Sequence, residues 1–282
     1  MILLCDKHMN DGRRMRTSLL RVVALAVAGI AATTALTACG SSSDAAAGGS
    51  GGPQTLRVGT LGDAPPNVYQ ENGIYTGFDN ELFKAVADKA GYKVEFVGTD
   101  FSALLGQVAN KTYDAGSSAI AQTEERRKTV DFTDPYNYEY ISILSKDKGI
   151  TDAKLLDGKR VAVIQATVGD KYLGANVPGA QIVRFPSYDT AIAGLRNGNA
   201  DAWVVDLTIA EKYAKEDPSL AVTATIEAND LPHGFAVRKG NDELRGKLND
   251  GLRAVIADGT WQKLHDKFIP SVPVPDKFKP KS

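Results

Sequence analysis

The chain has 282 residues, of which 43% are hydrophobic, so it can bury one large core or two of ordinary size, and disorder of the whole chain is excluded. Its 33 Lys and Arg residues nearly balance its 34 Asp and Glu residues, giving a formal net charge of −1 with no long run of one sign. Nucleic acid is therefore not an expected partner.

The first 38 residues have the pattern of an export signal. Three arginines between residues 13 and 16 precede an apolar stretch that is too short to span a bilayer comfortably. The stretch ends in LTAC, residues 36–39, which resembles a bacterial lipobox, where the cysteine is lipidated and becomes the first residue of the mature protein. We therefore expect a lipoprotein signal peptide over 1–38 and a membrane anchor at Cys39. An ordinary signal peptide is the alternative.

The use of cysteine agrees with this layout. The other cysteine, Cys5, lies inside the segment that would be removed, so the mature protein would have no disulfide, no thiol nucleophile and no cysteine-based metal site. Residues 39–53 contain GSSSDAAAGGSGGP, which offers nothing that could pack and predicts a flexible tether. The expected layout is an anchor, a tether and a folded body on the outer side of the cell membrane.

From residue 54 onward, strand-like runs alternate with segments whose apolar residues recur at helical spacing. We expect strands at 55–60, 93–98, 113–120, 157–165, 181–185, 200–206 and 233–239. Between and after them we expect helices at 78–92, 101–110, 168–173, 188–198, 207–215, 241–259 and 260–268. Such alternation predicts parallel sheets covered by helices, with any ligand in a crevice at the carboxyl ends of the strands.

We expect the βαβ series to run twice, over about 55–135 and about 158–235, with an extended stretch at 131–149 between them. The predicted fold class is α/β, with two similar Rossmann-like lobes joined by extended hinge strands. We expect lobe 1 to comprise 54–138 plus 236–282, and lobe 2 to comprise 139–235.

A short predicted helix near residue 123 concentrates unusual charge. Thr123 is a good N-cap, and the two glutamates after it suit the electropositive first turn, but Arg126, Arg127 and Lys128 then follow within the same turn. Departures from local rules often mark functional residues. From these residues alone, a fully solvated cationic face remains an open alternative.

No enzyme motif survives inspection: the glycine cluster GGSGG at 48–52 fits G-x-S-x-G only through its composition and belongs to the low-complexity linker, and the sequence has no phosphate-binding loop and no H-E-x-x-H. The two histidines outside the leader, His233 and His265, are far apart in sequence and lack companion ligands. We therefore expect packing or surface roles for both, and neither a cofactor nor a metal.

Five motifs in order, GIYTGFDNELFKAVADKAG, TDFSALLGQV, TEERRKTVDFTDPY, LDGKRVAVIQATVG and NGNADAWVVD, resemble the family-3 extracellular solute-binding proteins that supply ABC importers with amino acids. The resemblance covers essentially all of residues 54–270. It implies a type II periplasmic binding protein-like fold, whose lobes close on an amino acid at a hinge. It also implies a monomer that delivers its ligand to permease subunits and catalyses nothing.

The resemblance further implies a site for the ligand's α-carboxylate. The arginine that grips this group falls on Arg126, whose planar guanidinium matches the two oxygens. From the other lobe, the Thr167 hydroxyl and the Val168 N–H, at a helix N-terminus, would bind the same carboxylate. A plain N-capping role for Thr167 remains open, and Arg127 and Lys128 would stay solvated.

For the ligand's ammonium group, the resemblance implies the Asp206 carboxylate and the Ala119 carbonyl. Asp206 could instead cap the following helix. The sequence departs from the family at Ala121, where a threonine is usual, so one hydroxyl is lost while the backbone contact can persist.

Selectivity for the ligand side chain is less defined. Phe101 matches the aromatic residue of the family's DFS motif, although a core role is open, and Ala64 and Asn67 occupy the usual places of a second aromatic residue. A polar Asn67 suggests a polar ligand, and Asp63 could reach the same region or serve as a turn residue.

Two further functions stay open at this point. One is an enzyme on the same scaffold, similar to the cyclohexadienyl dehydratases, which fold alone does not exclude. The other is the ligand-sensing module of a receptor.

Overall fold

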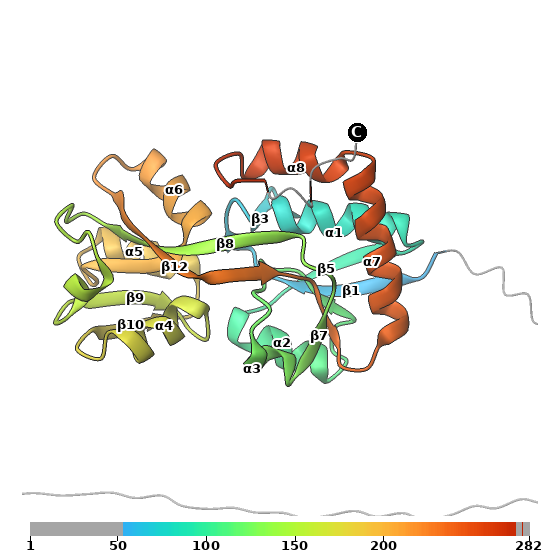
Figure 1. The fold of residues 1–282 in the computed structure, drawn as a ribbon, viewed down its shortest axis with the longest axis horizontal. Coiled ribbons are helices and arrows are strands. Elements are labelled where there is room, and N and C mark those ends of the chain that lie inside the picture. Colours follow the sequence, from blue (N-terminus) through green and yellow to red (C-terminus); the bar gives the residue numbers. More distant parts are fainter. Residues whose placement is uncertain (1–52, 275–277, 279–282) are drawn as a thin grey trace, which may run out of the picture. The chain divides into compact units, whose positions relative to one another are not determined.

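Two mixed β-sheets with helices packed against them form the body of the protein in the computed structural model (Figure 1), which describes residues 53–274 and 278. The predicted signal peptide, Cys39 and the tether up to residue 52 lie outside the described residues. Within the described part of the chain, no helix is long and apolar enough to cross a membrane.

The sheet of the first lobe has the strand order β5-β1-β6-β13-β7. β1 pairs in parallel with both β5 and β6, as the alternation predicts, whereas β13 runs antiparallel to β6 and β7. The expectation of wholly parallel sheets was wrong, because β13 enters this sheet from the other lobe. The strands are β1 Thr55–Thr60, β5 Lys93–Gly98, β6 Ala115–Gly116, β7 Val130–Phe132 and β13 Ala236–Arg238.

The helices of this lobe are α1 Phe78–Lys89, α2 Phe101–Ala109, α3 Glu124–Arg127, α7 Asp242–Ala257 and α8 Thr260–Phe268. Of the strand expected over 113–120, only Ala115–Gly116 are observed as strand, and Ala119 beyond them has a φ of 45°. A small three-stranded antiparallel sheet that was not expected consists of β2 Asp63–Ala64, β3 Val68–Glu71 and β4 Ile74–Thr76. Asn72 and Gly73 both have positive φ, as a two-residue type I′ hairpin turn requires.

The sheet of the second lobe has the order β10-β9-β11-β8-β12, with β9 parallel to β10 and β11, and β8 antiparallel to β11 and β12. Its strands are β8 Asn137–Ser145, β9 Arg160–Ile164, β10 Gln181–Phe185, β11 Ala202–Asp206 and β12 Ala221–His233. Its helices are the 3-10 helix η1 Ala153–Leu156, α4 Val168–Asn176, α5 Tyr188–Arg196 and α6 Leu207–Glu216.

The long strands β8 and β12 connect the two lobes. They pair antiparallel from Asn137–His233 at one end to Ser145–Ala221 at the other, with a register shift between Ile226 and Leu231. β12 was missed from the sequence, because its irregular middle interrupts the alternation that marks a strand. The predicted fold class, two α/β lobes joined by extended strands, is confirmed, while the exact lobe boundaries stay a prediction.

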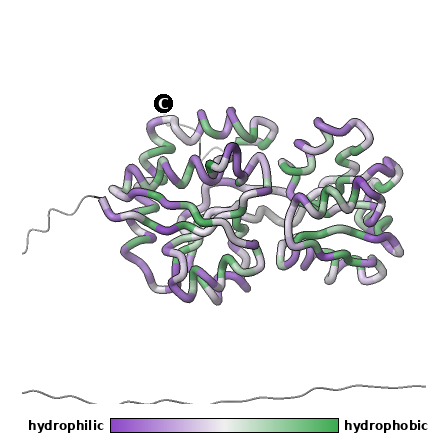
Figure 2. The backbone as a smooth tube through the Cα atoms, turned by 180° about the vertical axis from the view of Figure 1, so that it is seen from behind, coloured by the Kyte–Doolittle hydropathy of each residue, from purple (hydrophilic) through white to green (hydrophobic). Residues whose placement is uncertain are grey.

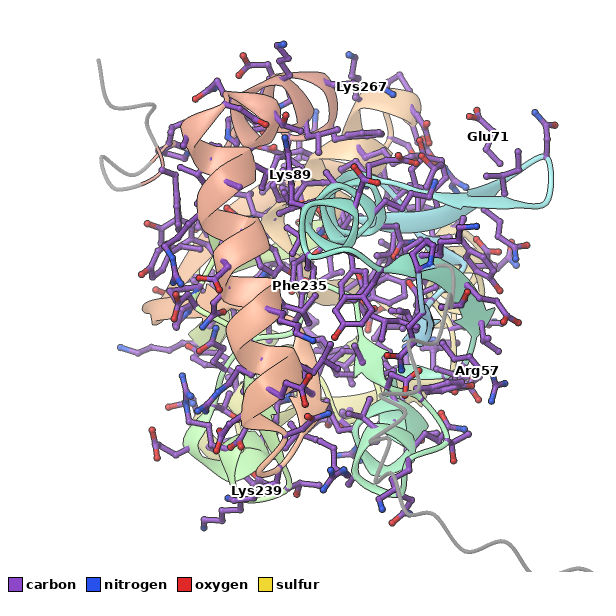
Figure 3. The ribbon with its side chains drawn as sticks, turned by 90° about the vertical axis from the view of Figure 1, so that its right-hand side faces the viewer. Arg57, Glu71, Lys89, Phe235, Lys239 and Lys267 are labelled. Carbon is purple, nitrogen blue, oxygen red and sulfur yellow. The ribbon has the colours of Figure 1, made fainter. Side chains whose placement is uncertain are left out.

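Hydrophobic residues follow the strands and the inner faces of the helices, with hydrophilic residues at the outer turns (Figure 2). In the first lobe, Phe235 is fully buried in the hydrophobic core, while labelled charged residues such as Glu71 and Lys239 lie at the periphery (Figure 3). Its ring stacks on Tyr136, with 4.3 Å between ring centroids, and meets Phe83 edge-on at 4.9 Å. This aromatic packing supports the region where β8 and β12 enter the first lobe.

Candidate functional site

A narrow pocket that opens to solvent lies where the two lobes meet. Both lobes contribute to its walls, together with the connecting strands. The lining residues are Phe101, Ser118, Ala119, Ala121, Arg126, Tyr140, Ile141, Thr167, Val168, Tyr188, Asp206 and His233. Seven of the nine residues that the sequence indicates for the ligand are thus brought together from segments up to 105 positions apart.

Arg126 is directed into this pocket by the local structure of α3. The Thr123 hydroxyl accepts a hydrogen bond from the Arg126 N–H at 3.3 Å, which confirms Thr123 as the N-cap. The buried guanidinium donates from Nη1 to the Ala121 carbonyl (2.9 Å) and from Nη2 to the Ala166 carbonyl (3.2 Å). It also lies 4.9 Å from the ring centroid of Phe101. These contacts hold the guanidinium fork in one orientation inside the pocket.

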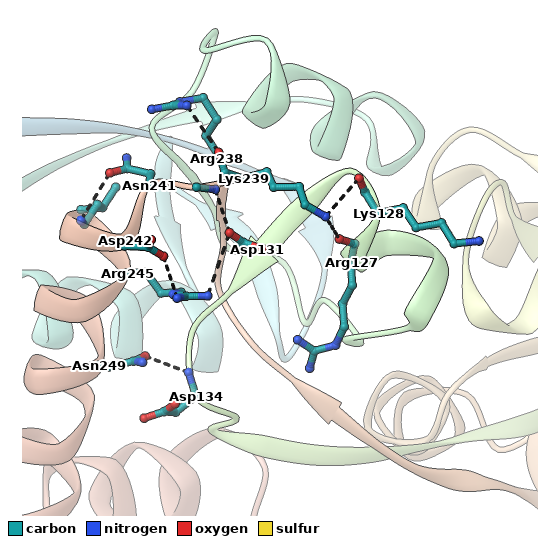
Figure 4. A network of polar contacts seen from close by, with 12 residues as sticks. Arg127, Lys128, Asp131, Asp134, Arg238, Lys239, Asn241, Asp242, Arg245 and Asn249 are labelled. Carbon is teal, nitrogen blue, oxygen red and sulfur yellow. Dashed lines mark hydrogen bonds and ion pairs between the residues drawn. The ribbon is translucent and has the colours of Figure 1, made fainter.

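The two neighbouring cations lie on the surface. Arg127 and Lys128 are exposed, and their carbonyl groups accept hydrogen bonds from Lys239 Nζ at 2.7 and 3.5 Å (Figure 4). The Arg127 guanidinium donates to the Gln122 side-chain oxygen and lies over the ring of Phe132. One of the three cations is therefore in the pocket and two are outside it.

Asp206 ends β11 and stands directly before α6, at the N-cap position, but its side chain makes no capping hydrogen bond. Burial raises the pKa of the Asp206 carboxyl to about 6, and the positive charge of Arg126 opposes this rise. Burial likewise lowers the pKa of Arg126 to about 10, opposed by Asp206. The pocket thus holds one fixed cation and one anion that ionises near neutral pH.

Thr167 and Val168 form the second-lobe wall at the start of α4. Thr167 is the N-cap: its hydroxyl accepts from the Asp170 N–H (3.3 Å) and donates to the Ile164 carbonyl (2.8 Å). The capping role that the sequence left open is thus observed, and Thr167 lines the pocket as well.

Asn67 and Asp63 lie outside the lining of the pocket, at contacts between the lobes. The Asn67 amide donates to the Thr208 hydroxyl at 3.1 Å. Asp63 Oδ2 accepts from the N–H groups of Tyr188 (2.7 Å) and Asp189 (3.4 Å), at the start of α5. Desolvation raises the pKa of the Asp63 carboxyl, and the bonds to these N–H groups oppose that rise. Both side chains join the lobes beside the pocket.

Sequence reasoning missed several lining residues, above all His233 and Tyr188. His233 is buried and pairs with Ala121 in a β-bridge at the end of β12. Burial, with the nearby charge of Arg126, lowers the pKa of its ring to about 3, so it is neutral at physiological pH. The sequence places His233 at the start of an expected strand, 233–239, but local periodicity does not show which segment that residue faces. Among residues 53–274, no cluster of three or more His, Cys, Asp or Glu side chains could hold a metal ion.

The chain is similar to proteins of known family. A model of the family described as bacterial extracellular solute-binding proteins, family 3, matches residues 56–271. The arginine-binding extracellular protein ArtP of Bacillus subtilis (strain 168) is 32% identical over 260 residues, which cover 90% of this chain and 98% of that protein.

Two solved structures share both fold and sequence with the chain. An ancestral arginine-binding protein bound to arginine is 35% identical, with a TM-score of 0.73 and coverage of 78% of this chain and 100% of that one. An ancestral amino-acid-binding protein described as a precursor of cyclohexadienyl dehydratase is 36% identical, with a TM-score of 0.70 and coverage of 76% and 95%. Both likenesses extend over nearly the whole of the solved chains.

Proposed function

The chain belongs to the bacterial extracellular solute-binding proteins of family 3, and from this premise we propose that it captures an L-amino acid between its two lobes and delivers it to the permease subunits of an ABC importer. Because this family is extracellular, the protein binds its ligand outside the cytoplasm. We further propose that it acts as a monomer and binds without catalysis.

One observation carries the proposal: Arg126 and Asp206 lie on opposite lobes and line the same pocket. An amino acid at neutral pH is a zwitterion, so its carboxylate can bind the guanidinium while its ammonium binds the carboxylate. The Val168 N–H at the start of α4 and the Ala119 carbonyl would complete the two subsites. Closure around the ligand would exclude water and strengthen both ion pairs.

The rest of the pocket wall favours a polar ligand side chain. Tyr140, Tyr188 and neutral His233 present rings with polar tips, and Phe101 adds a flat apolar surface. Aromatic faces of this kind can stack on a guanidinium or an amide. Because the names of similar proteins state arginine, L-arginine is the first candidate.

Calorimetric titration of the purified folded body with the twenty common amino acids tests this proposal. We expect at least one L-amino acid to bind with a dissociation constant of about micromolar or tighter, with its D-enantiomer as the control. Absence of binding across the panel would contradict the proposed function. Incubation with prephenate, followed by measurement of its consumption, tests the dehydratase alternative that the related ancestral precursor raises.

We propose that Cys39 carries a lipid anchor, on the evidence of the LTAC sequence and the glycine- and serine-rich segment behind it. Cys39→Ala is expected to move the protein from the membrane fraction to the soluble fraction, because one lipidated residue would be its attachment. Fractionation followed by immunodetection measures this. Equal membrane retention of the variant and the wild type would exclude an anchor at this residue.

Binding should weaken in mild acid. The Asp206 carboxyl has a raised pKa of about 6, and only its ionised form attracts an ammonium group. As the pH falls through this value, the site takes up a proton that the ligand must displace, so affinity falls by up to about tenfold per pH unit. Titration of L-arginine between about pH 7.5 and about pH 5 measures the slope. An affinity that is flat or rises toward acid would contradict the role of Asp206.

A further inference from the structure

A buried carboxylate beside the pocket has no part in the binding described above. Asp79, the second residue of α1, is 1% exposed. Its Oδ1 accepts a hydrogen bond from the Ala119 N–H at 3.0 Å and another from the Tyr136 hydroxyl. Buried carboxylates are costly unless they are compensated, so this one is a candidate for a role at the neighbouring site.

Ala119, which Asp79 holds, has an unusual backbone. Its φ of 45° lies in the left-handed region, which costs an alanine about 1 kcal/mol or more. Ala119 also lines the pocket. Such a conformation persists only when the surroundings enforce it, and the bond from its N–H to a buried carboxylate does so directly. The bond to Asp79 fixes the peptide group that precedes Ala119, and the left-handed conformation of Ala119 then sets the direction of its carbonyl.

The second lobe repeats this arrangement and shows what it achieves. Ala166 also has a left-handed backbone, with a φ of 65°, and its N–H donates to Asp170 Oδ2 at 3.1 Å. The carbonyl of Ala166 then accepts a hydrogen bond from the Arg126 guanidinium at 3.2 Å. In that lobe, an aspartate that holds a left-handed alanine turns the alanine carbonyl toward a cation.

We propose that Asp79 is a positioning residue for the ligand's ammonium group: by holding the Ala119 N–H, it keeps the Ala119 carbonyl turned into the pocket as an acceptor. This inference rests on the proposed function, because it requires a ligand with an α-ammonium group. Asp79 itself does not touch the ligand.

The electrostatics of Asp79 fit such a site. Burial raises the pKa of the Asp79 carboxyl to about 7, the bonds from Tyr136 and Ala119 oppose the rise, and the negative charge of Asp206 adds to it. A bound ammonium group would relieve the repulsion between the two carboxylates. In the unliganded protein the repulsion between the Asp79 and Asp206 carboxylates is therefore unrelieved, and a bound cationic group can offset it.

Two substitutions separate positioning from other roles. Asp79→Ala removes the acceptor for the Ala119 N–H, whereas Asp79→Asn keeps an oxygen that can accept the same bond. Each variant is titrated with two probe pairs: L-arginine and 5-guanidinopentanoic acid, and L-glutamine and glutaramic acid. The second member of each pair lacks only the α-amino group. Circular dichroism and thermal melting establish that each variant is folded.

We expect Asp79→Ala to weaken amino-acid binding by about tenfold or more and to weaken the deaminated analogues by less than about threefold. Asp79→Asn should restore most of the lost affinity. Tyr136→Phe, which removes the hydrogen bond that the Tyr136 hydroxyl donates to Asp79 and leaves the bond from the Ala119 N–H, is the matched control and should keep wild-type selectivity. If Asp79→Ala does not fold, Asp79→Ser, which is too short to reach the Ala119 N–H, takes its place.

Equal losses for amino acids and deaminated analogues would overturn the inference, because they would show a general effect on the pocket. A loss in Asp79→Asn as large as that in Asp79→Ala would also overturn it, since the charge and not the hydrogen bond would then matter. Failure of the wild type to bind any amino acid would instead contradict the proposed function, and with it the premise of this inference.

Discussion

Replacement of Arg126 by alanine is expected to weaken the binding free energy of every amino-acid ligand by about 2 to 5 kcal/mol. This is the range for removing one partner of a buried, hydrogen-bonded charge pair. The structure supports a large effect, because this guanidinium is buried and oriented by the Ala121 and Ala166 carbonyls. The loss should be similar for all side chains, since the α-carboxylate is common to every amino acid. Calorimetric titration of a ligand panel measures it.

Arg126→Lys should recover little of this affinity, because an ammonium group cannot reproduce two parallel hydrogen bonds to a carboxylate. Arg127→Ala is the matched control: Arg127 is the next residue, is exposed and lies outside the pocket lining, so affinity should change by less than about 0.5 kcal/mol. Thermal melting is needed beside the titrations, because Arg126 also covers Phe101. Normal binding by Arg126→Ala, or an equal loss in Arg127→Ala, would show that the carboxylate subsite lies elsewhere.

Asp206→Asn is expected to weaken the binding free energy of amino acids by about 2 to 4 kcal/mol. The affinity for analogues without an α-amino group should not fall. The asparagine keeps the size of the side chain but loses the charge that attracts an ammonium. For a deaminated acid the same change removes a repulsion between two carboxylates, so its affinity should hold or rise. Titration with L-arginine and 5-guanidinopentanoic acid gives both values.

Glu216→Gln, an exposed acid at the far end of the helix that follows Asp206, is the control for net charge and should leave both affinities unchanged. The acid-dependent loss of affinity should also become smaller in Asp206→Asn, because the carboxyl that titrates near pH 6 is gone and Asp79, with a pKa of about 7, is left. A parallel loss of both probes would mean that Asp206 supports the pocket without contacting the ammonium.

Much of the fold was predictable from local patterns. The structure has strands at 55–60, 93–98 and 181–185, as the sequence indicates. Helices such as α1 and α2 also lie where apolar residues recur at helical spacing. The pattern failed at β12, whose register shifts break the alternation, and at β13, whose direction depends on a chain that returns from the other lobe. Whether two paired strands run parallel or antiparallel depends on the segment that connects them. The local periodicity of apolar residues does not contain this information.

The sequence by itself determined the alternation of strands and helices, the capped turn that carries Arg126, and, through its motifs, the residues expected at the two charged subsites. Only the tertiary structure decided what those residues face. It turned one of three adjacent cations inward, brought His233 and Tyr188 into the wall, and moved Asn67 to a contact with Thr208, 141 positions away. It also joined Asp79 to Ala119 across 40 positions. The reason is physical: helical and strand periods report which face of a segment is buried, whereas partners, orientation and desolvation arise only when distant segments pack together.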